Sequence, residues 1–372
     1  MYDVAIVGGG PSGLEAGRIL SKMGFNVVLL EEHREIGFPN HCAGLLGPEG
    51  FRYTYPFSSK SLIQVFDRVK LISDNISAEF ETKPIFSIDR TLFEVFLADD
   101  GIRNGLELIT ACRVINIQAE SDIKELIFLK RGFKERVRSK FVIAADGAAS
   151  LIRRRIFKDR VRLHYGIQAV FKREMEDVVE IYPWLSDSGF SWRVPYGSLE
   201  KIGVVCEKNP VHEVNRISLQ LKGDRPSRFE GGLIPDSHAK KLSYRGIVLV
   251  GDAAGFVKPI SRGGIYWGMK TARIASKYIS KALMQDNPSL LGLYGFEVKR
   301  SLYLSYIAGK LGRHILKLAG SNSDIFIGSI DDKTGEILGR HFNIDKQGLF
   351  FIYSLLSRYP VKLLYNFLRR ER

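Results

Sequence analysis

Short apolar runs separated by glycines recur along the first 250 residues of the chain. Residues 2–7 show the pattern of a buried strand, residues 14–23 the period of a helix, and residues 26–30 a second buried strand. Residues 141–147 and 246–252 are further apolar runs, and they end in Asp-Gly and Gly-Asp. Strands that alternate with a helix in this way predict α/β units around a parallel sheet.

The pattern changes between residues 160 and 240. Strand-like stretches cover residues 163–171, 189–194 and 202–206, which predicts an antiparallel sheet that forms one wall of a pocket. Prolines that we expect to break these strands stand at three positions: Pro183, Pro195 and Pro210. Aromatic residues in a sheet belong to the core more often than to a cavity, and this region has four: Trp184, Phe190, Trp192 and Tyr196.

The chain beyond residue 289 reads as helices. Residues 349–356 are strongly apolar, and the chain closes with Arg369, Arg370 and Arg372. We favour a helical lid over an apolar pocket. The alternative is an interfacial anchor, with its apolar face in lipid and its arginines on lipid phosphates.

The turn after the first strand is Gly8-Gly9-Gly10-Pro11-Ser12-Gly13, which has the G-x-G-x-x-G spacing of a dinucleotide site. Gly8 permits the tight turn, Gly10 allows a pyrophosphate to approach the backbone, and Gly13 allows close packing of helix and strand. The helix N-terminus then offers N–H groups to the phosphates. Glu31 follows Gly8 by 23 residues, where a carboxylate can accept both ribose hydroxyls, and its neighbour Glu32 is the competing candidate.

Two later segments fit the same ligand. Asp146-Gly147 ends the middle strand, with Ser150 and Arg153 at D-G-x-x-S-x-x-R spacing. Asp252 ends the strand over residues 246–252, where its carboxylate could hold ribityl hydroxyls. Gly263-Gly264-Ile265 opens a helix towards Met284, and its N–H groups could face a flavin pyrimidine. Three segments in this order predict that the chain binds FAD.

At 372 residues the chain is too long for one simple core. We expect a Rossmann-type FAD-binding domain built from residues 1–160 and 241–288, with a short insertion near residues 55–90 that joins the substrate sheet. Residues 161–240 form that α+β substrate domain, and residues 289–372 form a helical C-terminal region.

The hydrophobic content of 45% and the charged content of 26% are ordinary for a folded soluble protein, and three cysteines are too few for a disulfide framework. The seven histidines have no spacing that predicts a metal site. No charged leader or apolar signal core precedes the first strand, so we expect a cytoplasmic protein, with contact to a membrane surface as an alternative. The net charge of +14 fits a basic proteome or an anionic ligand or membrane; without a recognisable motif, nucleic acid is not expected as a partner.

These motifs together resemble those of the geranylgeranyl reductase flavoproteins. That family is similar to the digeranylgeranylglycerophospholipid reductases and lies within the larger group of FAD-dependent aromatic hydroxylases. Residues 251–255, Pro259 and residues 263–265 resemble the GDAAG…P…GGGI signature, although Arg262 stands where that family usually carries glycine. Residues 35–44 resemble a segment that carries a cysteine near the flavin, and residues 87–90 resemble an arginine segment that contacts the cofactor.

The resemblance implies a set of site residues. It places the motif glycines and Asp146, named above, along FAD. It also places ten further residues there: Ser12, Glu31, Cys42, Ala43, Gly44, Arg90, Val114, Asp252, Gly264 and Ile265. Residues 190–195 resemble a Y-x-W-x-F-P segment that lines the lipid cavity in these reductases, which implies that Trp192 and Pro195 contact substrate.

Reduced flavin can deliver a hydride to a carbon–carbon double bond, but an isolated alkene also needs a proton. Cys42 is the candidate acid, and a thiol that packs against the flavin without chemistry is the alternative; His41 could tune it. Cys112 and Cys206 lie in strand-like patterns and are expected in the core.

The leading hypothesis is an FAD-dependent reductase that saturates isoprenoid double bonds of a prenyl lipid. The alternative is an FAD-dependent monooxygenase or halogenase with an apolar or aromatic substrate, because D-G-x-x-S-x-x-R suits hydroxylases equally well. No second G-x-G-x-x-G appears, so NAD(P)H would dock transiently, or a ferredoxin-like carrier would supply the electrons.

Overall fold

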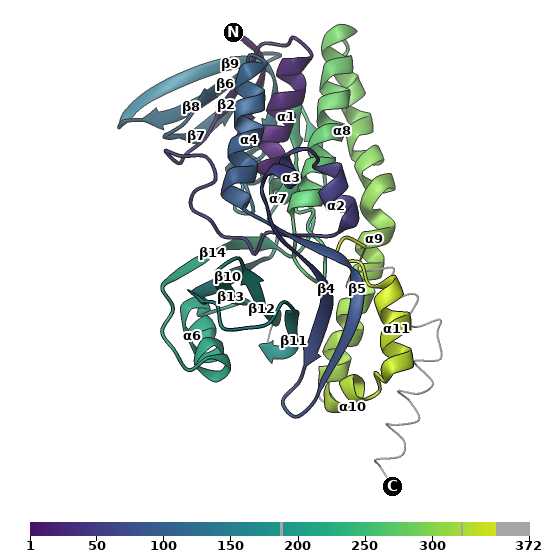
Figure 1. Ribbon diagram of the computed structural model, residues 1–372. Helices are drawn as coiled ribbons and strands as arrows, with labels where there is room; N and C mark the ends of the chain where they lie inside the picture. Colours follow the sequence, from purple (N-terminus) through teal and green to yellow (C-terminus); the bar gives the residue numbers. More distant parts are fainter. Residues whose placement is uncertain (187–188, 321–322, 347–372) are drawn as a thin grey trace.

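The computed structural model describes residues 1–186, 189–320 and 323–346 of the chain (Figure 1). Its strands form two sheets that lie one above the other in Figure 1, joined by the connections near α2 and α3. The first sheet consists of β1 (Tyr2–Val7), β2 (Val27–Leu30), β6 (Glu107–Ile109), β7 (Cys112–Gln118), β8 (Lys124–Lys130), β9 (Phe133–Ala144), β15 (Ser243–Tyr244) and β16 (Ile247–Leu249).

The first sheet is parallel at its centre. Its order is β15-β16-β9-β1-β2-β6, and β16, β9, β1, β2 and β6 pair in parallel, while β7 and β8 extend from β9 as an antiparallel ribbon. The central strands are buried on both faces, as their continuous apolar runs require. The predicted α/β fold is confirmed.

Helices α1 (Pro11–Lys22), α4 (Arg90–Arg103) and α8 (Ile265–Met284) lie side by side on one face of this sheet (Figure 1). Shorter helices join the segments: α2 (Pro48–Tyr53), α3 (Phe57–Lys60), α5 (Leu151–Ile156), α7 (Gly251–Ala254) and the 3-10 helix η1 (Pro288–Leu291). The strand expected over residues 246–252 is shorter than predicted, because the chain turns into α7 at Gly251. Asp252 therefore lies in a helical turn and not at a strand end.

The second sheet is mostly antiparallel, with the order β14-β10-β13-β12-β11-β4-β5-β3. Its strands are β3 (Leu45–Leu46), β4 (Leu62–Ile72), β5 (Ser77–Ile88), β10 (Leu163–Lys172), β11 (Val179–Ser186), β12 (Gly189–Tyr196), β13 (Leu199–Cys206) and β14 (Arg228–Pro235). The predicted antiparallel sheet is confirmed, and β11 joins β4 by a parallel pairing.

Pro183 and Pro195 lie inside strands, so the prediction that they break them is wrong, whereas Pro210 does lie between strands. Pro183 lies inside β11, where the pairing with β12 shifts register between Tyr182 and Ser186. Pro195 lies inside β12. Pro210 begins α6 (Pro210–Leu221), a position where a missing N–H costs nothing. α6 buries Val214 and Ile217 against β10 and β13.

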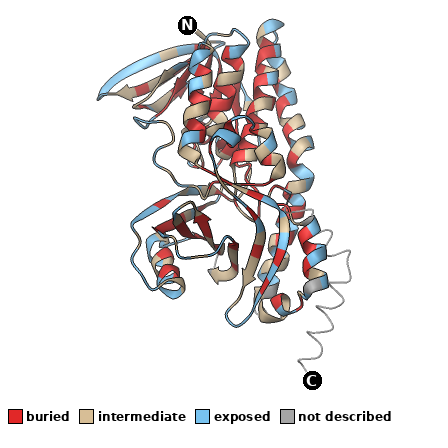
Figure 2. Ribbon diagram, viewed as in Figure 1, coloured by how far each residue is buried: buried red, intermediate tan, exposed pale blue. Residues whose placement is uncertain are grey.

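The C-terminal region is helical, as predicted, through α9 (Gly292–Ala319), α10 (Ser323–Gly328) and α11 (Asp332–His341). Figure 2 shows the buried residues concentrated where helices and sheets meet. Residues 349–372, for which a lid or an anchor was predicted, lie outside the described residues. Within the described part of the chain, no helix is both long and apolar enough to cross a bilayer.

Candidate functional site

A cavity of about 600 Å³ lies between the two sheets. Its polar half is formed by the carboxyl ends of β1, β2 and β9 with the loops that follow them. Its apolar half is formed by side chains of β5, β11 and β12 and of the segment after α11: Ile85, Val179, Ile181, Phe190, Trp192, Val194, Phe342 and Ile344. One cavity thus joins the dinucleotide motif to a hydrophobic wall.

The glycines of the first turn have the two roles that the motif predicts. Gly8 has φ +103°, and a Cβ there would lie 2.3 Å from the carbonyl oxygen of Ala145. A Cβ on Gly13 would lie 2.0 Å from the carbonyl oxygen of Gly8. Gly10, in contrast, has open space before it, so a ligand can approach its backbone and the start of α1. Gly13 supports the turn from beneath and does not line the cavity.

Glu31 ends β2 and is buried, whereas Glu32 is exposed, which favours Glu31 as the ribose ligand. Its Oε2 accepts a hydrogen bond from Gly9 N at 2.5 Å, and its Oε1 accepts one from His33 N at 2.8 Å. These bonds fix the carboxylate at the edge of the cavity beside the glycine turn.

Asp146 and Arg153 explain the D-G-x-x-S-x-x-R spacing. Asp146 Oδ2 accepts a hydrogen bond from Ile152 N at 3.1 Å, while its buried Oδ1 has no partner within the described chain and lies at the cavity. Ser150 caps α5 by accepting from Arg153 N. The buried Arg153 guanidinium donates to the carbonyl of Ala253 at 2.7 Å, so it joins the second segment to the third.

Asp252 lies in the first turn of α7 and lines the cavity. Burial raises the pKa of its carboxyl to about 6, against the opposing effect of the Arg90 and Arg153 guanidiniums. Arg90 is itself fixed by an ion pair of 2.6 Å between its Nε and Glu94 Oε1. Gly264 must be small, because a Cβ there would lie 2.7 Å from Asp252 Oδ1. Gly264 and Ile265 begin α8 at the cavity, as predicted.

The Cys42 loop lines the cavity with His41, Cys42 and Ala43. Cys42 is partly buried, and its Sγ accepts a hydrogen bond from Gly44 N at 3.4 Å. Gly44 has φ +75°, and a Cβ there would lie 2.3 Å from the Ile88 carbonyl oxygen, so this turn requires glycine. Gly44 therefore shapes the loop and is not itself among the lining residues. His41 also lines the cavity, and its Nδ1 lies 2.6 Å from the Pro39 carbonyl oxygen.

A buried polar network beneath this loop was not predicted from the sequence. The Cys42 carbonyl accepts hydrogen bonds from Gln168 Nε2 at 3.1 Å and from Lys201 Nζ at 3.3 Å. Both side chains also bind Glu230, at 2.8 and 3.1 Å. Gln168, Lys201 and Glu230 stand on the neighbouring strands β10, β13 and β14, so only the strand register brings them together. The second sheet thereby holds the cysteine loop in place.

Trp192 lines the cavity, whereas Pro195 does not. Side chains alternate between the faces of a strand, so Phe190, Trp192 and Val194 face the cavity and Pro195 faces away. Pro195 thus does not line this cavity, and its substrate contact stays a prediction. The Trp192 ring lies across β13, where a Cβ on Gly203 would come within 2.1 Å of it. Its buried indole N–H has no partner within the described chain.

Arg262 occupies the position where a glycine was expected, and it keeps the left-handed backbone, with φ +59°. Its guanidinium binds Asp236, which also pairs with Arg313 and His164. Burial would raise the pKa of Asp236, but the hydrogen bond from His164 and the two guanidiniums hold it well below its usual range. The ion pair places a fixed arginine at the cavity.

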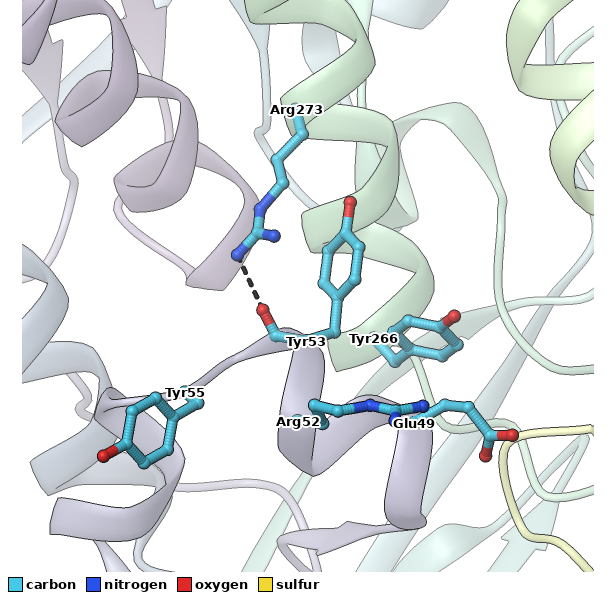
Figure 3. A pocket seen from close by; sticks show the side chains of 6 residues that line it. All are labelled: Glu49, Arg52, Tyr53, Tyr55, Tyr266 and Arg273. Carbon is cyan, nitrogen blue, oxygen red and sulfur yellow. Dashed lines mark hydrogen bonds between the residues drawn. The ribbon is translucent and has the colours of Figure 1, made fainter.

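A second, shallower pocket of about 400 Å³ lies beside α2 and α8 (Figure 3). It is lined by Glu49, Arg52, Tyr53, Tyr55, Tyr266 and Arg273. The Arg273 guanidinium lies 3.9 Å from the centre of the Tyr53 ring, donates to the Tyr53 carbonyl at 2.7 Å and pairs with Glu15. Because this charge is already engaged, we assign the functional site to the larger cavity.

Most of the predicted site residues meet in the larger cavity. Those that line it are Gly8, Gly10, Ser12, Glu31, Cys42, Ala43, Arg90, Val114, Asp146, Trp192, Asp252, Gly264 and Ile265. Cys112, expected in the core, is buried and also reaches the cavity wall, while Cys206 is buried beneath α6. The open backbone at Gly10, the fixed Glu31 and the unpartnered Asp146 oxygen suit a dinucleotide with two sugar units.

Comparisons with known proteins agree with this geometry. Residues 3–155 match the family model described as FAD dependent oxidoreductase. A digeranylgeranylglycerophospholipid reductase of Methanosphaera stadtmanae is 25% identical, covering 90% of this chain and 89% of that protein. The solved structure of a geranylgeranyl bacteriochlorophyll reductase-like protein from Thermoplasma acidophilum has a TM-score of 0.84 at 18% identity and covers 98% of both chains. A flavin-dependent brominase has a TM-score of 0.70 at 18% identity, covering 95% of this chain and 98% of that one.

The two structural comparisons show the shared fold. Together with the family model and the reductase sequence, they confirm the resemblance to the geranylgeranyl reductase flavoproteins. The chain is an FAD-dependent oxidoreductase.

The substitution Asp252→Asn tests the burial of the Asp252 carboxyl. Because burial raises its pKa from 3.8 to about 6, the carboxyl stabilises the fold while neutral, and this contribution is lost as the pH rises from about 4 through 6. In the apoprotein, Asp252→Asn should therefore gain stability over the natural chain between pH 4 and pH 7, by up to about 3 kcal/mol. Urea unfolding followed by tryptophan fluorescence measures this. The exposed Asp67→Asn is the control, and a stability difference independent of pH would contradict the prediction.

The substitution Lys201→Met tests whether the second sheet holds the Cys42 loop. Lys201 is both a hydrogen-bond donor to the Cys42 carbonyl and the charge partner of Glu230. Its loss should loosen the loop and raise the alkylation rate of Cys42 about tenfold. Alkylation with iodoacetamide, located by mass spectrometry, measures this rate. Lys222→Met removes the ion pair of 2.9 Å with buried Glu200 in the same sheet, away from the loop. It should leave the rate unchanged, and equal rates in both variants would refute the assignment.

Proposed function

We propose that this FAD-dependent oxidoreductase reduces isoprenoid carbon–carbon double bonds of a prenyl lipid. The observation that carries the proposal is the continuity of one cavity, in which the dinucleotide motif, the Cys42 loop and an apolar wall meet. A hydrocarbon chain suits a wall of isoleucine, valine and aromatic side chains. The reductase from Methanosphaera stadtmanae, whose name states a prenylated phospholipid substrate, supports this substrate class.

The residues of the polar half would hold FAD. Gly10, Ser12 and the start of α1 would bind the pyrophosphate through backbone N–H groups, and Glu31 would accept the ribose hydroxyls. The carboxylates of Asp146 and Asp252 would accept hydroxyls of the ribityl part, and the first N–H groups of α8 would face the pyrimidine. When bound and reduced, the flavin supplies the hydride for the double bond.

Cys42 is the proposed source of the proton that the alkene needs. It lines the cavity, and Gly44 N donates a hydrogen bond of 3.4 Å to its sulfur, which orients the side chain. The network of Lys201, Gln168 and Glu230 fixes the backbone of this loop. Fixed placement of an acid beside the reacting carbon is what general acid catalysis requires.

The electron donor is proposed to be NAD(P)H, docked transiently, or a ferredoxin-like carrier. A cytoplasmic enzyme that contacts a membrane would meet both a water-soluble donor and a lipid substrate.

An oxygen-dependent monooxygenase or halogenase is the second candidate function. The similarity of fold to a flavin-dependent brominase favours it, and an apolar cavity also suits an aromatic substrate. The two functions differ in their need for oxygen, because a reductase transfers its hydride to the substrate carbon directly.

The anaerobic reaction separates these functions. Photoreduced enzyme mixed with a geranylgeranyl glycerophospholipid should regain the absorbance of oxidised flavin without oxygen, and the lipid should gain two hydrogens for each flavin reoxidised. A phytanyl lipid of equal length has no double bonds and should leave the flavin reduced. Reoxidation that strictly requires oxygen would overturn the proposal.

The substitution Cys42→Ala tests the proposed acid. Loss of a general acid should lower the single-turnover rate of flavin reoxidation about 100-fold, while FAD still binds. Stopped-flow absorbance at one fixed pH measures this rate. Cys112→Ala is the matched control at a second thiol of the cavity wall. A change of less than about threefold in Cys42→Ala would assign the thiol to packing alone.

A further inference from the structure

Helix α9 is fixed to the protein along one face. Tyr294 donates from its hydroxyl to the Leu249 carbonyl at 2.6 Å, and the Trp184 indole N–H donates to the Leu316 carbonyl at 2.7 Å. Between these ends, Gly309 lies against Pro259, so closely that a Cβ there would come within 3.0 Å of the proline ring. The helix therefore presents a defined outer face along its length.

That outer face is apolar. Six large side chains point to solvent, with exposed fractions between 45% and 82%: Leu293, Phe296, Leu304, Ile307, Leu311 and Leu318. At about 100° per residue, their positions fall within about 80° of the helix circumference. We call these six residues the outer stripe. An exposed apolar stripe of this kind marks a site of interaction.

Basic residues accompany the outer stripe. Lys299, Lys310 and Lys317 are exposed and lie along one edge of it by the same helical spacing, and Arg300 lies within it. Within the described chain, no salt bridge joins these four side chains to a carboxylate. The one acidic residue of α9, Glu297, pairs with Lys277 at 2.9 Å and accepts from Tyr278 at 2.6 Å. The outer face of α9 thus combines hydrocarbon with uncompensated positive charge.

We propose that the outer stripe of α9 binds the surface of an anionic lipid bilayer. Apolar side chains on one face of a helix enter the boundary between headgroups and acyl chains, while lysines beside them bind lipid phosphates. The net charge of +14 adds a long-range attraction to such a surface. A second copy of the chain fits less well, because a twofold interface would bring two surfaces of the same positive charge together.

The inner side of the same helix reaches the cavity. Arg313 of α9 pairs with Asp236, which holds the cavity-lining Arg262, and Pro259 lies between Gly309 and the loop that starts α8. Figure 1 shows α9 running along the edge of the molecule, past both sheets. A bilayer on the outer stripe would therefore lie one helix away from the wall of the cavity.

Vesicle binding of the full-length holoenzyme tests this surface. In a sedimentation assay, the natural chain should bind vesicles that contain phosphatidylglycerol with at least tenfold higher affinity than vesicles of phosphatidylcholine alone. Added salt should weaken this binding. The double variant L304D/I307D should lose at least tenfold in affinity for the anionic vesicles. The variant K299Q/K310Q/K317Q should lose most of the preference for anionic lipid.

The control variant carries V211D and L219D on α6, where both side chains are also exposed. It should bind vesicles as the natural chain does, and bound FAD absorbance checks that each variant is folded. Equal binding by L304D/I307D, or no binding by the natural chain, would overturn the proposal. The proposal would also be overturned if light scattering showed that the natural chain is a dimer and that L304D/I307D is a monomer with unchanged vesicle binding. A negative result in vesicle binding would not change the outcome of the anaerobic reaction, so the two experiments test the two proposals separately.

Discussion

The close backbone contact between the first glycine turn and the end of β9 is the constraint on which the site depends. Gly8 meets the Ala145 carbonyl and Gly13 meets the Gly8 carbonyl at distances that exclude any side chain. This contact aligns the ends of β1 and β9, leaves Gly10 open, and sets Asp146 beside the turn. A single added methyl group at Gly8 or Gly13 would force these strands apart and open the dinucleotide edge of the cavity.

The second sheet contributes more than an apolar wall. Its buried side chains Gln168 and Lys201 donate hydrogen bonds to the backbone of the Cys42 loop, and Glu230 pairs with Lys201. The loop itself lies between strands β2 and β3 of the chain. A buried charged pair is costly unless its hydrogen bonds are satisfied, and here both partners and the loop carbonyl satisfy one another. The geometry of the cysteine is therefore set by residues far away in the sequence.

The features that could be predicted from the sequence are those that local patterns encode. The glycine turn, the buried strands and the start of α8 each have a spacing that backbone geometry demands, so the FAD edge could be predicted residue by residue. The insertion near residues 55–90 was expected to join the substrate sheet, but the parallel register of β4 with β11 has no such signal. The meeting of Lys201 with Glu230 follows from strand register alone. Pro195 lies off the cavity wall because a motif gives positions along a strand but not the face that each side chain takes. Arg262 stands where glycine was expected, and its charge is paired with Asp236, a residue distant in sequence that no local pattern pointed to.

The central claim is that one cavity holds FAD in its polar half and a prenyl chain in its apolar half. A crystal structure of the reduced protein with FAD and a prenyl glycerophospholipid tests it most directly. We expect the pyrophosphate at Gly10 and an isoprenoid double bond beside Cys42, with the prenyl chain lying along Trp192 and Ile181. Lipid density in the shallower pocket beside Tyr53 and Tyr55, with the apolar half of the larger cavity filled by water, would contradict it.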